Sequence, residues 1–181
     1  MAAIVSGEIL FKYSVVAAAG NTTASAAGTS LGDQISTTAW AGSVANDLFD
    51  DISGAENAAS TVDYRCIFVH NSNASNTLEN AVVYLSAETA GGAAIAVAVD
   101  GTAASAIASG STQAATIANE TTAPTGTGGF SSPTTVGTGL SLGNIPAGQC
   151  KAFWVRRTAA NTAALSNDGV TIAVAGDTGS L

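Results

Sequence analysis

The stretch Gln149-Cys-Lys-Ala-Phe-Trp-Val-Arg-Arg157 indicates the fold most clearly, because it has the length and residue types of a long β-strand. It directly follows the turn-forming sequence Pro146-Ala-Gly148. Side chains along a strand point alternately to the two faces of its sheet. One face would carry Lys151, Phe153, Val155 and Arg157, and the other would carry Cys150, Ala152, Trp154 and Arg156.

Four further segments show strand signals, either β-branched and aromatic residues or an alternation of small with branched residues. They are residues 63–71, 80–86, 94–100 and 170–175. The last of them follows Asn167-Asp-Gly169, a sequence typical of hairpin turns. Several short strands separated by turns, with no long amphipathic helix, are typical of sandwiches. We therefore predict an all-β fold, a single β-sandwich or jelly roll.

The sandwich is expected to comprise residues 62–181, and residues 1–61 are expected to form an extended N-terminal arm with loops. Apart from a short strand candidate at 8–13, the first part is rich in Gly, Ser, Thr, Asn and Ala with isolated large apolar residues. Phe11, Tyr13 and Trp40 would anchor this arm on a neighbouring subunit or on the shell of a larger assembly. Deleting residues 2–40 should then leave the sandwich folded.

The core of the sandwich should be built from the apolar residues of the strand candidates, which pack between the two sheets. These core residues are Ile67, Val69, Val83, Leu85, Ile95, Val97, Val155, Ile172 and Val174.

The composition limits the partners of the chain. Charged residues make up only 10% of the 181 residues, against roughly 25% in ordinary soluble domains, so Ser, Thr, Asn, Gly and Ala must cover most of the surface. The net charge is −8, and five basic residues are too few to neutralise a nucleic acid backbone or to hold an anionic membrane. The N-terminus has no positively charged region before an apolar run, so synthesis in the cytoplasm is expected.

Catalytic chemistry has little support in the sequence, and no enzymatic activity, cofactor or metal is expected. The single histidine, His70, ends a strand candidate and is expected at the rim of the sheet. Ser30 lies in a Gly-x-Ser-x-Gly match, but the nucleophile elbow needs a strand before it and a helix after it. The acidic residues Asp47, Asp50, Asp51 and Glu56 lack the alternate spacing of a calcium loop, which favours a solvated loop.

The two cysteines, Cys66 and Cys150, both lie in apolar strand candidates. Two buried thiols are expected, and a bridge between neighbouring strands is the alternative, because the sequence does not give the distance between their Cα atoms.

Four of the five basic residues lie on two strand candidates, which leaves two interpretations open. They can pair with acidic neighbours across the sheet. They can also form a small positive patch that docks on an acidic partner. The candidate contact residues are Arg65, Lys151, Arg156 and Arg157.

Several segments resemble small virion structural proteins of tailed bacteriophages. The resemblance lies in residues 63–71, 80–84, 119–124, 140–148, 154–158 and 167–169, and it extends over roughly residues 45–178. It implies a component of the phage particle without active-site residues. The implied role is a capsid decoration (cement) protein bound to the major capsid protein, and the alternative is a tail or baseplate component.

A carbohydrate-binding module or adhesin is a third alternative, which would need an exposed aromatic platform. The expected location is the virion, and a closed homo-oligomer would cover part of the neutral surface. A trimer is favoured over a dimer, since capsid lattices offer threefold positions.

Overall fold

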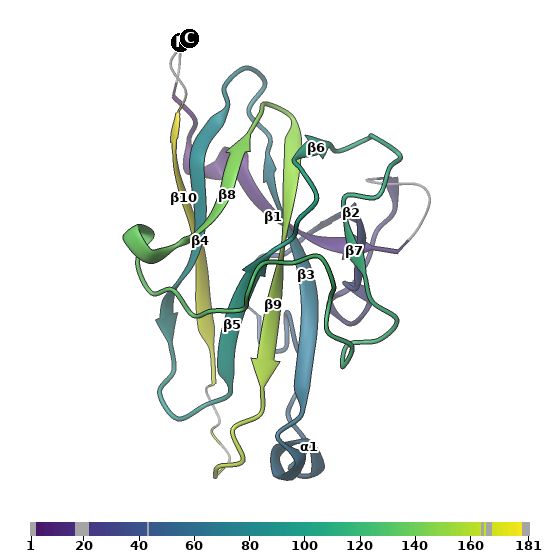
Figure 1. Ribbon diagram of the computed structural model, residues 1–181, viewed down its shortest axis with the longest axis vertical. Coiled ribbons are helices and arrows are strands. Elements are labelled where there is room, and N and C mark those ends of the chain that lie inside the picture. The colour runs from purple at the N-terminus through teal and green to yellow at the C-terminus, as the bar shows by residue number, and fades with distance from the viewer. Residues whose placement is uncertain (1–2, 17–21, 43, 164, 166–167, 179–181) are drawn as a thin grey trace.

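The computed structural model describes residues 3–16, 22–42, 44–163, 165 and 168–178, and it confirms the all-β prediction. Ten strands form two antiparallel sheets that resemble a sandwich, and α1 (Gly54–Ala59) is the one α-helix in these residues (Figure 1). Short 3-10 turns whose bounds lie in the described residues are η1 (Ser6–Glu8), η3 (Ala27–Thr29) and η4 (Val136–Thr138).

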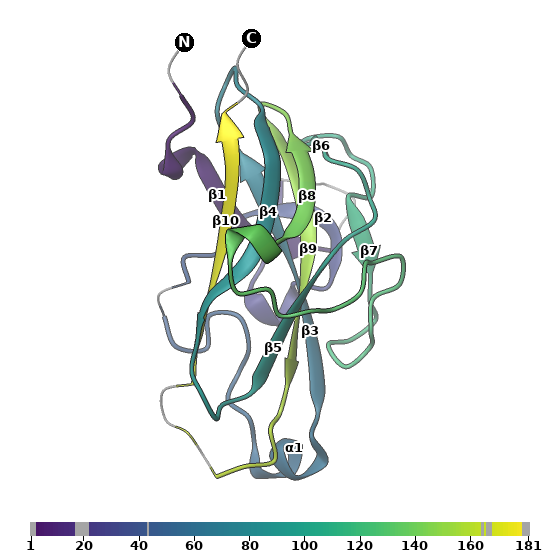
Figure 2. The same ribbon diagram turned by 60° about the vertical axis from the view of Figure 1, so that its left-hand side comes forward.

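The larger sheet has the strand order β5-β9-β3-β1-β2-β7, with β6 paired to β9. Its strands are β1 (Ile9–Val15), β2 (Gly32–Ala39), β3 (Val62–Asn71), β5 (Ala94–Val99), β6 (Ser105–Ala106), β7 (Ala114–Thr116) and β9 (Gln149–Thr158). The smaller sheet has the order β10-β4-β8, formed by β10 (Val170–Thr178), β4 (Leu78–Glu88) and β8 (Leu140–Ile145). Figure 2 shows the smaller sheet in front of the larger one.

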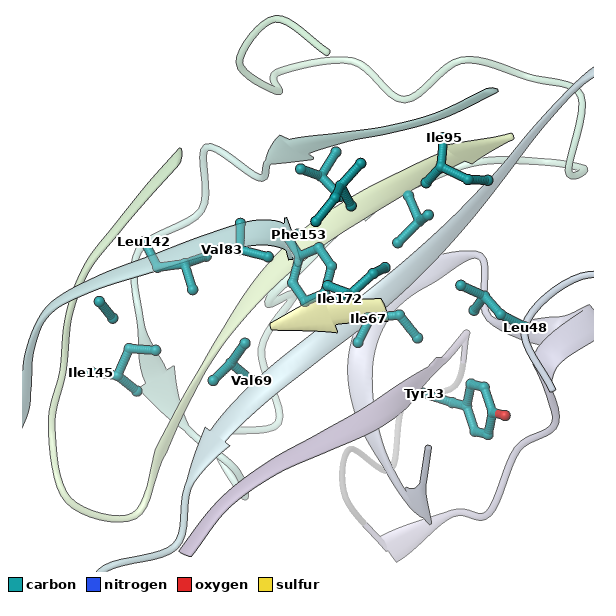
Figure 3. Packing of buried hydrophobic residues seen from close by; sticks show 14 of the residues in the cluster. Tyr13, Leu48, Ile67, Val69, Val83, Ile95, Leu142, Ile145, Phe153 and Ile172 are labelled. Carbon is teal, nitrogen blue, oxygen red and sulfur yellow. The ribbon is translucent and has the colours of Figure 1, made fainter. Parts of the chain in front are cut away.

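The pairing of β3 with β9 forms the centre of the larger sheet, and both faces of these strands are buried. Ile67 lies opposite Phe153, and their side chains pack against the smaller sheet (Figure 3). Cys66 lies opposite Trp154, and these side chains belong to a second cluster with Phe68, Ile35 and Ile117. Burial on both faces explains why the two segments contain nearly continuous large apolar residues.

The predicted core is confirmed for eight of its nine residues, each at most 8% exposed. Val174 is partly buried and packs against the same cluster. Tyr13, Leu78, Leu142, Ile145 and Phe153 complete much of this cluster, as Figure 3 shows for several of them.

The extended arm predicted for residues 1–61 is wrong, because two strands of this region belong to the larger sheet. Strand β1 pairs with β3 from Ile9 opposite Asn71 to Tyr13 opposite Ile67, and β2 pairs with β1. Strand β2 consists mostly of small and polar residues, but its single large apolar side chain, Ile35, is fully buried. One sheet therefore crosses the predicted boundary between residues 61 and 62.

The remaining edge of β3 is completed by two loop residues. Beyond the end of β1, the Cys66 amide donates to Ser30 O at 2.9 Å and the Tyr64 amide donates to Glu120 O at 2.7 Å. These bonds fix the segments around residues 30 and 120 beside the sheet. Within the described residues, no helix has the length and apolar character needed to cross a bilayer.

Candidate functional site

A cavity of about 590 Å³ opens at the end of the molecule where α1 lies. Its wall comes from described residues in three parts of the chain, within 40–57, 91–95 and 157–170. Figure 1 shows α1 and neighbouring connections at the lower end of the molecule. We call this space the loop-end cavity.

The segment that leads into α1 is fixed to the sheet through Phe49. The guanidinium carbon atoms of Arg65 and Arg157 lie 5.4 Å and 4.8 Å from the centroid of the Phe49 ring. Both distances are within the range of cation–π contacts. Arg157 Nη2 donates to Asp63 Oδ2 at 2.7 Å, and Arg157 Nη1 donates to Asp50 O. The buried end of the sheet therefore holds the loop through charged and aromatic groups.

Tyr13 holds the same loop from the neighbouring strand β1. Its hydroxyl donates to Asp47 Oδ1 at 2.7 Å and also contacts Asp47 O. Asp47 Oδ2 accepts from the Gly42 amide at 2.6 Å, so one carboxylate joins the start of the loop to the sheet. Burial, followed by the neighbouring Asp47 carboxylate, raises the pKa of Tyr13 well above its ordinary value, which keeps the hydroxyl a donor.

Hydrogen bonds between side chains and backbone groups connect the other walls of the cavity. Asp168 Oδ2 accepts from the Ala93 amide at 2.6 Å. A Cβ atom at Gly92 would lie 1.9 Å from Asp168 Oδ1, so only glycine lets the carboxylate reach this position. Asn57 Nδ2 of α1 donates to Thr162 O at 2.7 Å. The three segments of the wall are thus connected to one another.

Helix α1 begins with a capping box. Ser53 Oγ accepts from the Glu56 amide at 3.3 Å, and Glu56 Oε2 accepts from the Ser53 amide at 2.7 Å. These hydrogen bonds lower the pKa of Glu56. Glu56 therefore has a capping role, Asp50 pairs with Arg157 and Asp47 with Tyr13. No group of residues suited to hold a metal ion is found in the described part of the chain.

The loop-end cavity has an acidic and apolar lining. Four carboxylates contribute to it: Asp47, Asp50, Asp51 and Asp168. Arg157 is the one basic residue among the lining residues, and it is only 6% exposed. Val44 and Leu165, which also line the cavity, are 68% and 45% exposed. The surface can therefore offer negative charge and apolar contacts together.

A second cavity of about 520 Å³ shares Asn46, Leu48 and Asp50 with the loop-end cavity. The ion pair between Arg65 and Glu120 contributes to its wall. Since Glu120 O also accepts from the Tyr64 amide, Glu120 mainly joins its loop to β3. This second space is lined by residues that hold the fold together.

The predicted positive patch is wrong for three of its four residues, because Arg65, Lys151 and Arg157 are at most 8% exposed. The alternative interpretation, pairing across the sheet, is confirmed for Arg157, which lies directly opposite Asp63. Arg65 instead reaches Glu120 in a loop. Arg156 is partly exposed, with its guanidinium carbon 5.2 Å from the centroid of the Phe130 ring.

Lys151 belongs to a network of buried hydrogen bonds around Asp100. Its Nζ donates to Asp100 O at 2.7 Å and to Thr102 O, and burial lowers its pKa. Asp100 Oδ2 accepts from Trp154 Nε1 and from the Ala115 amide, both at 2.9 Å. These bonds attach the segment after β5 to β9 of the larger sheet.

The aromatic residues expected to contact a neighbour pack within the chain. The Phe11 ring lies edge-on to Trp40 at 5.6 Å and to Phe153 at 6.2 Å between centroids. Tyr13 is 5% exposed. Trp40 lines the loop-end cavity and is the one member of this group with access to a ligand there.

Ser30 and His70, the residues considered for catalysis, are both buried in the fold. Ser30 is fully buried, and its hydroxyl accepts from the Ser14 amide at 2.8 Å and donates to Cys66 O. His70 is not at an exposed rim, because it is only 6% exposed. Burial, with a contribution from the charge of Lys12, lowers the pKa of His70.

The thiols of Cys66 and Cys150 are both buried and free, as the first interpretation expects. Cys150 lies opposite His70, four residues along β3 from Cys66. This separation is about 13 Å, well beyond the reach of a disulfide. Burial raises the pKa of Cys150 to about 12.

Comparison with protein-family models, curated proteins and solved structures found no match.

The loop-end cavity could be foreseen only in part. The sequence places Asp47, Asp50 and Asp51 close together in one loop, so this part of the acidic lining could be recognised from the sequence. Asp168 and Leu165 are more than a hundred residues away, and only the pairing of β10 with β4 fixes their segment near residues 88–93. Neither residue carries a local signal that would assign it to the same cavity.

Proposed function

We propose that the chain is a structural subunit of a tailed-phage particle and that it decorates the capsid shell as a cement protein. The resemblance of residues 63–71, 140–148 and 154–158 to virion structural proteins supports this role. A sandwich whose loops are held by internal ion pairs and hydrogen bonds also suits a building block, since it presents a preformed surface to its partner.

The charge distribution on the surface is the observation that carries the proposal. Eleven of the thirteen carboxylates are at least partly exposed, whereas only Lys12 and Arg156 among the five basic residues are. The rest of the surface is mostly Ala, Gly, Ser and Thr. Such a surface is complementary to a basic partner, because opposite charges guide association and like charges oppose it.

A closed trimer is part of the proposal. Self-association would have to use the neutral parts of the surface, because contacts between acidic regions would bring like charges together. The extended arm is no longer available as the link between subunits, since β1 and β2 lie within the larger sheet of the same chain. Light scattering on the purified protein would measure the number of subunits.

The test uses undecorated capsids of a tailed phage that carries this gene. We expect the purified protein to sediment with these capsids at a saturating number of copies and to raise the temperature at which the shells open. Detection of the protein in isolated tails, with no binding to tailless heads, would contradict the decoration role and favour a tail component.

A further inference from the structure

The loop-end cavity brings exposed apolar side chains and carboxylates together at one place. Val44 and Leu165 are two of the five large hydrophobic residues that are exposed in the described chain, and both line this cavity. Exposed apolar side chains surrounded by polar groups are typical of binding sites. The volume of about 590 Å³ lies within the range of roughly 300–1,000 Å³ for ligand pockets.

The charge of the cavity selects a cationic ligand. Four carboxylates and one guanidinium group give its lining a formal charge of −3. The guanidinium group of Arg157 is already engaged by Asp63 and Asp50, so it is not free to bind an anion. A ligand with positive charge would therefore be attracted, and an anionic ligand would be repelled.

A second copy of this chain is a poor source of such a ligand. All five basic residues lie in the described part of the chain, and only Lys12 and Arg156 have exposed surface. Both lie within strands of the larger sheet, and the guanidinium group of Arg156 lies over the Phe130 ring. A second copy therefore offers no exposed cation on a loop among the described residues, and a different partner fits the cavity better.

Trp40 contributes an indole ring to the wall of the cavity. The ring packs edge-on against Phe11, which fixes its orientation. Its Nε1 atom is buried, so the ring presents mainly an apolar surface to the cavity. A sugar would need a broad aromatic face, and Trp40 is partly buried.

We propose that the loop-end cavity binds a basic and apolar peptide segment of the partner protein. Lysine or arginine residues of the segment would face Asp51 and Asp168, and its apolar side chains would contact Val44 and Leu165. The identification of the partner as a capsid subunit rests on the proposed function, whereas the chemistry of the peptide rests on the cavity itself.

A fluorescent peptide of alternating lysine and leucine is the probe, with a peptide of alternating glutamate and leucine for comparison. Fluorescence anisotropy would measure its affinity for the wild-type protein and for variants. The double variant V44S/L165S removes the exposed apolar contacts, and Asp51→Asn removes one exposed carboxylate. The matched controls are V136S and Asp177→Asn, which change another exposed valine and an exposed carboxylate outside the cavity.

We expect V44S/L165S to weaken binding of the basic peptide about tenfold or more, since a few buried apolar contacts dominate such interfaces. Asp51→Asn should weaken it about threefold and reduce its dependence on salt. Both controls should bind within about twofold of the wild type, because surface changes away from the site have small effects.

Equal affinity of V44S/L165S and V136S for the basic peptide would overturn this proposal. Equally tight binding of the acidic peptide, or displacement of the basic peptide by a neutral oligosaccharide, would do the same. Capsid binding unchanged by V44S/L165S would contradict this inference and leave the decoration role intact. Specific peptide binding without capsid binding would support the cavity and contradict the decoration role.

Discussion

Arg157 of β9 lies directly opposite Asp63 of β3, and the two buried side chains form an ion pair of 2.7 Å between Nη2 and Oδ2. The same guanidinium group contacts Asp50 and the ring of Phe49. Two neighbouring strands and the loop of the cavity therefore meet at one side chain. The position of the loop depends on the pairing of strands far away in sequence.

Replacing Arg157 with methionine should destabilise the fold strongly. The change would leave the Asp63 carboxylate buried without its partner, which typically costs about 3–5 kcal/mol. Urea denaturation would measure the free energy of unfolding. Arg156→Met is the matched control, with an expected loss of about 1 kcal/mol or less, because Arg156 is partly exposed and the contact found for its guanidinium group among the described residues is with an aromatic ring. A loss equal to that of the control would contradict the role given to Arg157.

Replacing Tyr13 with phenylalanine should loosen the loop at residues 42–50 while the sandwich stays folded. The lost hydroxyl donates to Asp47, and such a hydrogen bond contributes about 1 kcal/mol. Hydrogen exchange of the amides near Asp47 should become faster. Tyr64→Phe serves as control, since the contact found for its side chain is with the Phe130 ring. Unchanged exchange in the Tyr13 variant would show that the loop is held by other groups.

Deleting residues 2–40 should prevent cooperative folding. The deletion removes β1 and β2, exposes the backbone edge of β3 at Ile67 and Val69, and removes the buried side chain of Ile35. Circular dichroism during heating should show no sharp transition. A cooperative transition like that of the full chain would indicate that these strands are dispensable, as the arm interpretation would require.

The stability of the fold should decrease as the pH falls from 7 to 5, because His70 is buried with a lowered pKa. Its ordinary pKa is 6.5, so the unfolded chain takes up a proton in this range before the folded chain does. Its Nδ1 atom is buried without a hydrogen-bond partner in the described structure, which also disfavours a second proton on the ring.

Urea denaturation at several pH values would measure this dependence, and His70→Gln should remove most of it. The exposed Glu8 and Glu56 have pKa values lowered by hydrogen bonds, so their contributions are lost only below about pH 4.5. Since His70 is the single histidine, an equal slope between pH 7 and 5 in the variant would refute the assignment.

The strands with large apolar residues were predictable from the sequence, whereas β2 was not. The segments at 63–71 and 149–157 contain β-branched and aromatic residues on both faces, and they became the two central strands β3 and β9. Strand β2 has one large apolar residue in eight, so its sequence resembles a loop. Its strand structure depends on pairing with β1 and on the burial of Ile35, which local sequence does not reveal.

The positions of the charged residues were harder to predict than the strands. The pattern placed Arg157 and Phe153 on the same face of their strand, and both are buried. Pairing with an acidic neighbour across the sheet was one of two interpretations left open, and the sequence did not identify Asp63 as the partner. Arg65 pairs with Glu120, 55 residues away in a loop. Such contacts depend on how the loops return to the sheet, and alternation along a strand carries no information about them.

The attachment to the capsid is tested most directly by electron cryo-microscopy of undecorated capsids saturated with the protein. We expect added density at symmetry-related positions on the shell, with the sandwich oriented so that α1 and the loop-end cavity face the capsid protein. Saturated capsids without added density, or density in which the opposite end of the sandwich contacts the shell, would contradict the account.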